Sequence, residues 1–203
     1  MLYKNWEMGV GRRRKNDMKN VILIHGYNGI PKIYEWLKNE LEKWKYNVIL
    51  PEFPPREGVI YEEWKKIFEQ YRAYINSDSI IVAHSIGNEF IIKYMNENNL
   101  KTELYISLAG FSQYFEWENK KDLNRACKNF LVSKSELENF KAKCNKRYSI
   151  YSNNDHLVPF ELLEQFPKSI DAIPILIENI GHMGKKSGIE EIPKVVELIE
   201  ENE

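Results

Sequence analysis

The stretch Ser79-Ile-Ile-Val-Ala83-His84-Ser85-Ile86-Gly87 decides the fold. Residues 79–83 form a short run that is apolar on both sides, as expected for a strand buried in the centre of a parallel sheet. Directly after it, apolar residues recur at helical spacing, at Ile86, Phe90, Ile91, Tyr94 and Met95. A serine therefore stands at the junction where a buried strand turns into a helix.

On both sides of this junction, short β-branched runs alternate with longer segments of helical period. The expected strands cover residues 20–25, 48–50, 79–83, 104–108, 148–151 and 172–177, and the expected helices cover 33–44, 61–75, 86–95, 160–166 and 189–199. This alternation is typical of a parallel sheet with helices on both faces. The sequence therefore predicts an α/β fold with three layers and a mostly parallel sheet.

Length and charge limit the possible classes of function. The 203 residues suit one domain with a sizeable core. With 29 basic and 30 acidic residues the formal charge is −1, and residues 1–20 carry a local charge of +4, which leaves −5 for the remainder. No apolar run reaches the ~18–20 residues of a membrane span. We therefore expect neither a nucleic acid nor a membrane as partner, whereas a protein partner stays unknown.

The chain is expected to divide into an extension and one domain. Residues 1–17 are polar and basic, and we expect a disordered extension, with an RNA-binding or partner-binding arm as the alternative. Residues 18–203 form the domain, in which residues 111–146 interrupt the alternation and predict a small cap-like insertion. This segment begins with an aromatic cluster that suits either core packing or the wall of a pocket, formed by Phe111, Tyr114, Phe115 and Trp117.

The two cysteines give no sign of a cross-link or a metal site. Cys127 and Cys144 belong to no CxxC pair and to no Cys/His cluster with the spacing of metal ligands. We therefore expect reduced thiols, no structural metal and a cytoplasmic protein.

The turn around Ser85 has the residue pattern of a catalytic nucleophile. Small residues two positions to either side, Ala83 and Gly87, let strand and helix close together and lift the serine clear of the backbone. The backbone N–H of Ile86 lies in the first turn of the expected helix, where amides lack internal partners. It can therefore donate to an oxyanion that forms beside Ser85.

A second oxyanion donor is expected from the loop after the first strand, His25-Gly26-Tyr27-Asn28-Gly29. The glycines Gly26 and Gly29 let its backbone pass close to a ligand. We assign the backbone N–H of Tyr27 as this donor.

A serine hydroxyl needs a base, and the base needs a carboxylate that orients it. His182 lies between Gly181 and Gly184 in the loop after the last strand and is the expected base. Asp155 follows the strand 148–151 and is the expected acid. All three side chains then gather at the carboxyl ends of parallel strands, where open α/β sheets place their sites.

The other candidates fit less well. Asp171 is the alternative acid, but it precedes its strand and so falls at the opposite end of the sheet. His25 and His84 lie inside the two turns already described and suit structural hydrogen bonds. His156 is interpreted as a surface neighbour of the acid.

Four motifs resemble a known family when they are taken in order: His25-Gly26-Tyr-Asn-Gly29, Ala83-His84-Ser85-Ile86-Gly87, Asn154-Asp155-His-Leu-Val158-Pro159 and Gly181-His182. They are similar to those of the small serine hydrolases of the α/β-hydrolase superfamily, the group similar to retinoblastoma-binding protein nine, over roughly residues 19–201. The resemblance implies a compact α/β-hydrolase fold without the first antiparallel strands of larger relatives. It also implies a nucleophile at Ser85, an acid at Asp155, a base at His182 and no cofactor. Ala83 departs from the glycine that is usual at this place.

Together these residues predict a carboxylesterase-like serine hydrolase. It would cleave a small ester, thioester or activated amide through an acyl-enzyme, with a small acyl compound and water as its substrates. The alternative is a catalytically idle scaffold that binds protein partners through residues 1–17 and 111–146. A phosphate-binding enzyme is less well supported, because the chain lacks both GxxxxGK[ST] and GxGxxG.

Overall fold

The structure is a computed structural model in which residues 18–203 are described, so the expected extension at 1–17 lies outside the described residues. The described strands form one six-stranded sheet in the order β2-β1-β3-β4-β5-β6. Every neighbouring pair in this sheet is parallel. The strands are β1 (Asn20–Ile24), β2 (Asn47–Ile49), β3 (Ile80–His84), β4 (Thr102–Leu108), β5 (Cys144–Tyr151) and β6 (Ile173–Leu176).

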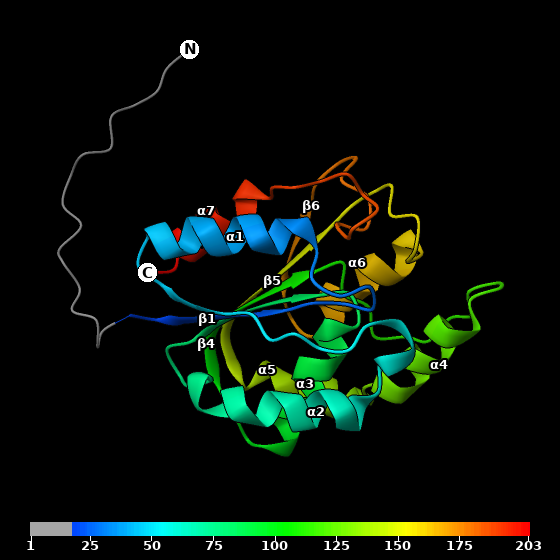
Figure 1. Cartoon of the computed structure of the whole chain (residues 1–203), viewed down its shortest axis with the longest axis horizontal. Helices are drawn as coiled ribbons and strands as arrows, with labels where there is room; N and C mark the ends of the chain where they lie inside the picture. The colour runs from blue at the N-terminus through cyan, green and yellow to red at the C-terminus, as the bar shows by residue number, and fades with distance from the viewer. Residues whose placement is uncertain (1–17) are drawn as a thin grey trace, which may run out of the picture.

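Helices cover both faces of the sheet. Helices α1 and α7 lie on one face, and α2, α3 and α5 lie on the other (Figure 1). The α-helices are α1 (Lys32–Lys43), α2 (Tyr61–Phe68), α3 (Gly87–Glu97), α4 (Lys121–Phe130), α5 (Lys134–Lys141), α6 (Phe160–Ser169) and α7 (Pro193–Glu200). The expected three-layer α/β-hydrolase fold is therefore confirmed. No helix in the described part of the chain is long and apolar enough to cross a bilayer.

The central strand β3 is buried along its whole length, as its apolar run predicts. It lies between β1 and β4, with Ala83 opposite both Ile24 and Ser107. The carboxyl ends of these three strands therefore lie at one edge of the sheet. Loops that follow the strands meet there, which is where open α/β sheets form their sites.

Strand β5 begins at Cys144 rather than at residue 148, so the end expected for the insertion at 146 falls inside the strand. The first residues of β5 pair with the start of β4 but include the exposed Asn145 and Lys146. Because they contribute little to the core, hydrophobicity does not mark them as strand. The segment between β4 and β5 contains α4 and α5.

Two expected helices also differ from the structure. The helix expected over 61–75 is α-helical only to Phe68 and continues as a 3₁₀ helix, η3 (Glu69–Tyr74). The last helix begins at Pro193 rather than near residue 189, because proline suits the first turn of a helix. A further 3₁₀ helix, η2 (Arg56–Gly58), lies in the proline-rich loop after β2. None of these differences moves the strand ends that carry the candidate site.

Candidate active site

Ser85 occupies a sharp turn between β3 and α3. Its backbone has a φ of +54°, in the left-handed region that a serine adopts at a cost of about 1–2 kcal/mol. The Ser85 N–H donates to the carbonyl of Leu108 at 2.9 Å, so the neighbouring strand β4 holds the turn in place. The turn lifts the hydroxyl out of the sheet toward the site, as expected for a nucleophile elbow.

The small residues around this turn are required by close backbone approach. A Cβ on Gly87 would lie 2.6 Å from the carbonyl oxygen of His25, and a Cβ on Gly26 would lie 2.9 Å from the Cβ of Ser85. Gly29 has a φ of +83° and closes the turn after β1 through its N–H, which donates to the Gly26 carbonyl at 3.2 Å. The methyl group of Ala83 is fully buried within β3, so the sheet accommodates this departure from glycine.

Ser85, His182 and Asp155 form a continuous hydrogen-bonded chain. The Ser85 Oγ and the His182 Nε2 lie 3.0 Å apart, and the His182 Nδ1 and the Asp155 Oδ2 lie 2.7 Å apart. The His182 and Asp155 side chains are only 6% and 1% exposed. An ionised Asp155 accepts a hydrogen bond from the Nδ1–H of His182, which leaves Nε2 unprotonated and able to accept the proton of the serine.

Asp155 is held as a carboxylate despite its burial. Burial alone would raise the pKa of Asp155. Hydrogen bonding to His182 and the charge of that ring, together with the backbone N–H groups of Leu157 and Val158, outweigh burial and lower the pKa below its usual value. These two N–H groups donate to Oδ1 at 2.8 and 3.0 Å. One oxygen of the carboxylate is thus fixed by the backbone and the other faces the imidazole.

Hydrogen bonds connect the loop after β5 to the loop after β6 close to the Asp155 and His182 side chains. The Gly181 N–H donates to the Asn154 Oδ1 at 2.8 Å, and the Ile180 N–H donates to the Ser152 Oγ at 3.1 Å. Gly181 has a φ of +58°, which suits a glycine at this point of the turn. These bonds hold the loop with the histidine against the loop with the aspartate.

Two backbone N–H groups near Ser85 have no acceptor within residues 18–203. They belong to Ile86, directly after the serine, and to Tyr27, in the loop after β1. Both residues line the same cavity as Ser85. Unpaired donors at such a place can stabilise an oxyanion.

The structure brings His84 against the candidate base. The His84 Nε2–H donates to the backbone carbonyl of His182 at 2.7 Å. Burial, together with repulsion from His182, lowers the pKa of His84 to about 3, so this ring stays neutral. The sequence predicts a structural hydrogen bond for His84, but its partner follows only from the fold.

His25 also makes structural hydrogen bonds. Its Nδ1–H donates to the Gly26 carbonyl at 2.8 Å, and its Nε2 accepts the N–H of Phe53 at 3.0 Å. Burial lowers the pKa of His25 to about 4. The ring therefore braces the turn after β1 as a neutral group.

The remaining candidates lie apart from the hydrogen-bonded chain. Asp171, the alternative acid, is exposed and forms an ion pair with Arg147 at 3.2 Å. His156 is exposed, as a surface neighbour should be, but it also lines the cavity, with its ring centroid 6.4 Å from that of His182.

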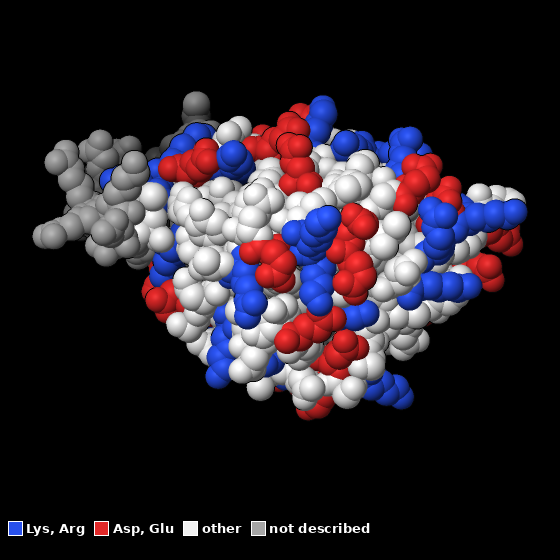
Figure 2. All heavy atoms as spheres, turned by 60° about the horizontal axis from the view of Figure 1, so that its bottom comes forward, with Lys and Arg blue, Asp and Glu red and all other residues white. Residues whose placement is uncertain are grey.

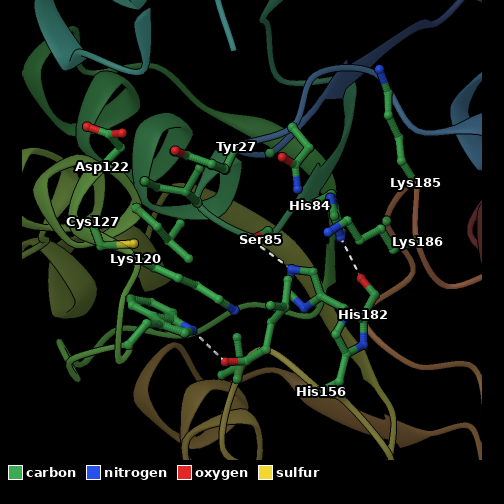
Figure 3. A pocket seen from close by; sticks show the side chains of 18 of the residues that line it. Tyr27, His84, Ser85, Lys120, Asp122, Cys127, His156, His182, Lys185 and Lys186 are labelled. Carbon is green, nitrogen blue, oxygen red and sulfur yellow. Dashed lines mark hydrogen bonds between the residues drawn. The ribbon is translucent and has the colours of Figure 1, made fainter. Parts of the chain in front are cut away.

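A cavity of about 290 Å³ opens above Ser85 (Figure 3). Its apolar wall includes Phe111, Trp117 and Val158, so part of the aromatic cluster lies both in the core and beside the site. The Trp117 Nε1–H donates to the Leu157 carbonyl at 2.7 Å, which anchors the start of the segment between β4 and β5 over the cavity. A small organic molecule fits a pocket of this kind. Within residues 18–203, no three His, Cys, Asp or Glu side chains lie close enough together to hold a metal ion.

Comparison with known proteins gives concordant matches. A family model described as serine hydrolase matches residues 21–201. The candidate hydrolase YdeN of Bacillus subtilis (strain 168) is 23% identical over 185 residues, which cover 89% of this chain and 94% of that protein. The solved structure of the ydeN gene product superimposes with a TM-score of 0.75 at 22% identity, covering 91% of this chain and 98% of that one.

More distant solved structures share the fold. A structure from a study of carboxylesterases of the thaumarchaeon Nitrososphaera gargenis has a TM-score of 0.69 at 12% identity, over 91% of this chain and 89% of its own. A thioesterase domain from the curacin biosynthetic pathway has a TM-score of 0.63 at 13% identity, over 90% and 91%. Identities at this level show the fold alone.

Proposed function

The chain belongs to the serine hydrolase family, and we propose that it hydrolyses a small ester, thioester or activated amide through an acyl-enzyme on Ser85. The single observation that carries this proposal is the chain of hydrogen bonds from Ser85 through His182 to Asp155, at 3.0 and 2.7 Å. These are the distances at which a base can take the proton of a serine and a carboxylate can orient that base.

In the first half of the reaction, the Ser85 Oγ attacks the carbonyl carbon while its proton passes to the Nε2 of His182. The N–H groups of Tyr27 and Ile86 donate to the resulting oxyanion, and each such donor is worth about 3–4 kcal/mol in a serine hydrolase. Asp155 stabilises the imidazolium ion without taking its proton. His182 then returns the proton to the leaving group as the bond to carbon breaks.

In the second half, water attacks the acyl-enzyme and His182 takes its proton. The second oxyanion collapses, the acid product leaves, and the proton returns to Ser85. Apart from substrate and water, these steps need Ser85, His182 and the N–H groups of Tyr27 and Ile86, whose residues line the cavity. They also need Asp155, which is buried behind His182.

Ester and thioester substrates are supported by two kinds of observation. A cavity of about 290 Å³ with apolar walls suits a small acyl group. Among the proteins of the same fold, one belongs to a study of carboxylesterases and another is a thioesterase domain. The cytoplasm remains the proposed location, supported by the two cysteines, which are free and buried.

The test is turnover of 4-nitrophenyl esters of increasing chain length by the full chain and by Ser85→Ala. We expect the variant to lose at least a thousandfold in kcat/KM while its melting temperature stays close to that of the wild type. Ser149→Ala is a matched control, because Ser149 is buried in β5 and its hydroxyl has no partner in the described residues. A Ser85→Ala variant with near-normal turnover contradicts the proposal. No observation on the described residues favours the alternative of an idle protein-binding scaffold.

A further inference from the structure

The charged side chains around the cavity are mostly of one sign. Lys120 and Lys121 line it at the start of α4, and Lys185 and Lys186 line it from the loop that follows His182. Figure 3 shows Lys120 on one side of Ser85, and Lys185 and Lys186 on the other. The mouth of the cavity is therefore flanked by lysines from two separate segments.

These positive charges are not neutralised by neighbours. Within residues 18–203, none of the four lysines forms an ion pair with a carboxylate. Asp122 lines the same cavity, but its carboxylate is paired with Arg125 at 3.2 Å. An ammonium group without a partner beside a cavity can bind an anion that enters it.

The four lysines around the cavity do not belong to a larger basic surface. The chain after residue 20 carries a formal charge of −5. On the face of the molecule in Figure 2, acidic and basic side chains are interspersed, with no large patch of one sign. An approaching anion thus meets attraction from these lysines only within about 10 Å at 0.1 M salt, which is the scale of the cavity mouth.

The lysines differ in where they point. In Figure 3 the side chain of Lys120 extends across the cavity toward the side of His182, whereas that of Lys185 extends away from Ser85. The Lys185 Nζ lies 3.7 Å from the place of a Cβ on Gly29, above the turn after β1. Of these two lysines, Lys120 is therefore the better placed to contact a substrate that occupies the cavity.

We propose that the substrate carries an anionic group such as a carboxylate in addition to its scissile bond, and that Lys120 is a specificity-determining residue that binds this group. Hydrolysis of this substrate rests on the proposed function, whereas binding of its anionic group by Lys120 does not. The anionic group can belong to the acyl part or to the leaving group, and the experiment separates these two sources.

Two pairs of esters test the proposal, each pair differing in one negative charge. The acyl pair is 4-nitrophenyl hydrogen glutarate and its neutral isostere, 4-nitrophenyl 5-methylhexanoate. The leaving-group pair is the acetate ester of 4-hydroxybenzoate and that of methyl 4-hydroxybenzoate. At low salt we expect kcat/KM to favour the anionic member of one pair by about fivefold to tenfold, and 1 M NaCl should reduce the preference below twofold.

Variants connect the preference to the lysine. Lys120→Met should reduce the ratio of anionic to neutral kcat/KM by about fivefold, and Lys120→Glu should invert it. Lys134→Met is the matched control, because Lys134 is exposed at the start of α5, outside the cavity, and its loss changes the net charge equally. The proposal is overturned if, in each pair, the wild type has the same kcat/KM for the anionic and the neutral ester. It is also overturned if Lys120→Met leaves a preference for the anionic ester intact.

A binding measurement keeps this inference separate from the reaction. Calorimetry on Ser85→Ala compares the affinities of the two members of the acyl pair and of the leaving-group pair. Tighter binding of one anionic ester by severalfold, lost when Lys120→Met is added, supports the inference even where the wild type turns over no ester. Equal affinities within both pairs overturn it, whatever the fate of the proposed function.

Discussion

Replacing Asp155 by asparagine removes one charge while leaving the shape of the site almost unchanged. The Asp155 Oδ1 accepts the backbone N–H groups of Leu157 and Val158 at 2.8 and 3.0 Å. In Asp155→Asn these two donors still require an acceptor at that position, so the amide oxygen must occupy it. The NH₂ group of the asparagine is then turned toward the Nδ1 of His182, in the place of the Oδ2 that lies 2.7 Å away.

This orientation reverses the tautomer of the imidazole. Facing an NH₂ donor, the Nδ1 of His182 must accept, and the neutral ring carries its proton on Nε2 instead. Nε2 lies 3.0 Å from the Ser85 Oγ and can then no longer accept the serine proton. We expect the rate of acylation to fall by about 10³–10⁴-fold, which corresponds to roughly 4–5.5 kcal/mol on the activation barrier.

The assay is the rate at which a fluorophosphonate phosphonylates the serine with loss of fluoride, since this reaction needs the same base and requires no knowledge of the substrate. Asp171→Asn is the control, because Asp171 is exposed and pairs with Arg147 away from the site, and its rate should equal that of the wild type. A folded Asp155→Asn variant that reacts within tenfold of the wild type would falsify the assignment of the acid and the reasoning about the tautomer.

The same variant has a stability signature. Because the pKa of Asp155 is lowered in the folded state, its carboxylate contributes stability above its unfolded pKa, and this contribution is lost as the pH falls through the lowered value. The wild type should therefore be more stable than Asp155→Asn at pH 7, and the difference should shrink toward pH 3 in urea titrations. A difference that does not change with pH would contradict the assigned pKa direction.

Three further predictions concern the residues that support the site. Gly87→Ala should lower the free energy of unfolding by about 1–3 kcal/mol and slow fluorophosphonate labelling, because its Cβ would meet the His25 carbonyl oxygen at 2.6 Å; thermal unfolding and labelling rates measure both effects. Because the pKa of His25 is lowered to about 4 in the folded state, the fold should lose stability as the pH falls from about 6.5 toward 4, by up to about 1.4 kcal/mol per pH unit; urea titrations of His25→Gln should show a smaller loss of stability between pH 7 and 5 than those of the wild type. Burial raises the pKa of Glu89 well above its usual value, and its oxygens have no partner in the described residues, so Glu89→Gln should gain stability relative to the wild type as the pH rises from 5 to 8.

Each of these three expectations has an outcome that would count against it. A Gly87→Ala variant as stable and as reactive as the wild type would mean that α3 can move away from the end of β1 at no cost and so make room for the added Cβ. If His25→Gln loses as much stability as the wild type between pH 7 and 5, groups other than His25 cause that loss. Equal pH dependence of the wild type and Glu89→Gln would mean that Glu89 reaches water.

The sequence predicts those parts of the fold that have a strong local signal. Strand β3 is found because all five of its residues are apolar or lie in the motif, and its turn is found because small residues flank Ser85. The start of β5 is missed because Asn145 and Lys146 are exposed there and the pairing with β4 is set by topology. Local hydrophobicity reports burial, and these residues are held in the sheet by hydrogen bonds instead.

The candidate site divides in the same way. Ser85, Asp155 and His182 are found because each follows a predicted strand and the chemistry of a serine nucleophile needs all three residue types. The bond from His84 to the carbonyl of His182 is not predicted, because it depends on how two distant loops fold together. The lysines on the two sides of the cavity are not predicted either, since neither pair of residues carries a motif.

The measurement that tests the central claim most directly is the site of covalent labelling by a fluorophosphonate, located by mass spectrometry of peptides from the full chain. We expect one equivalent of label on Ser85, and labelling at least a thousandfold slower when His182 is replaced by alanine in an otherwise folded protein. A folded wild type that takes up no label, or takes it up at another residue, would contradict the claim that Ser85 is an activated nucleophile.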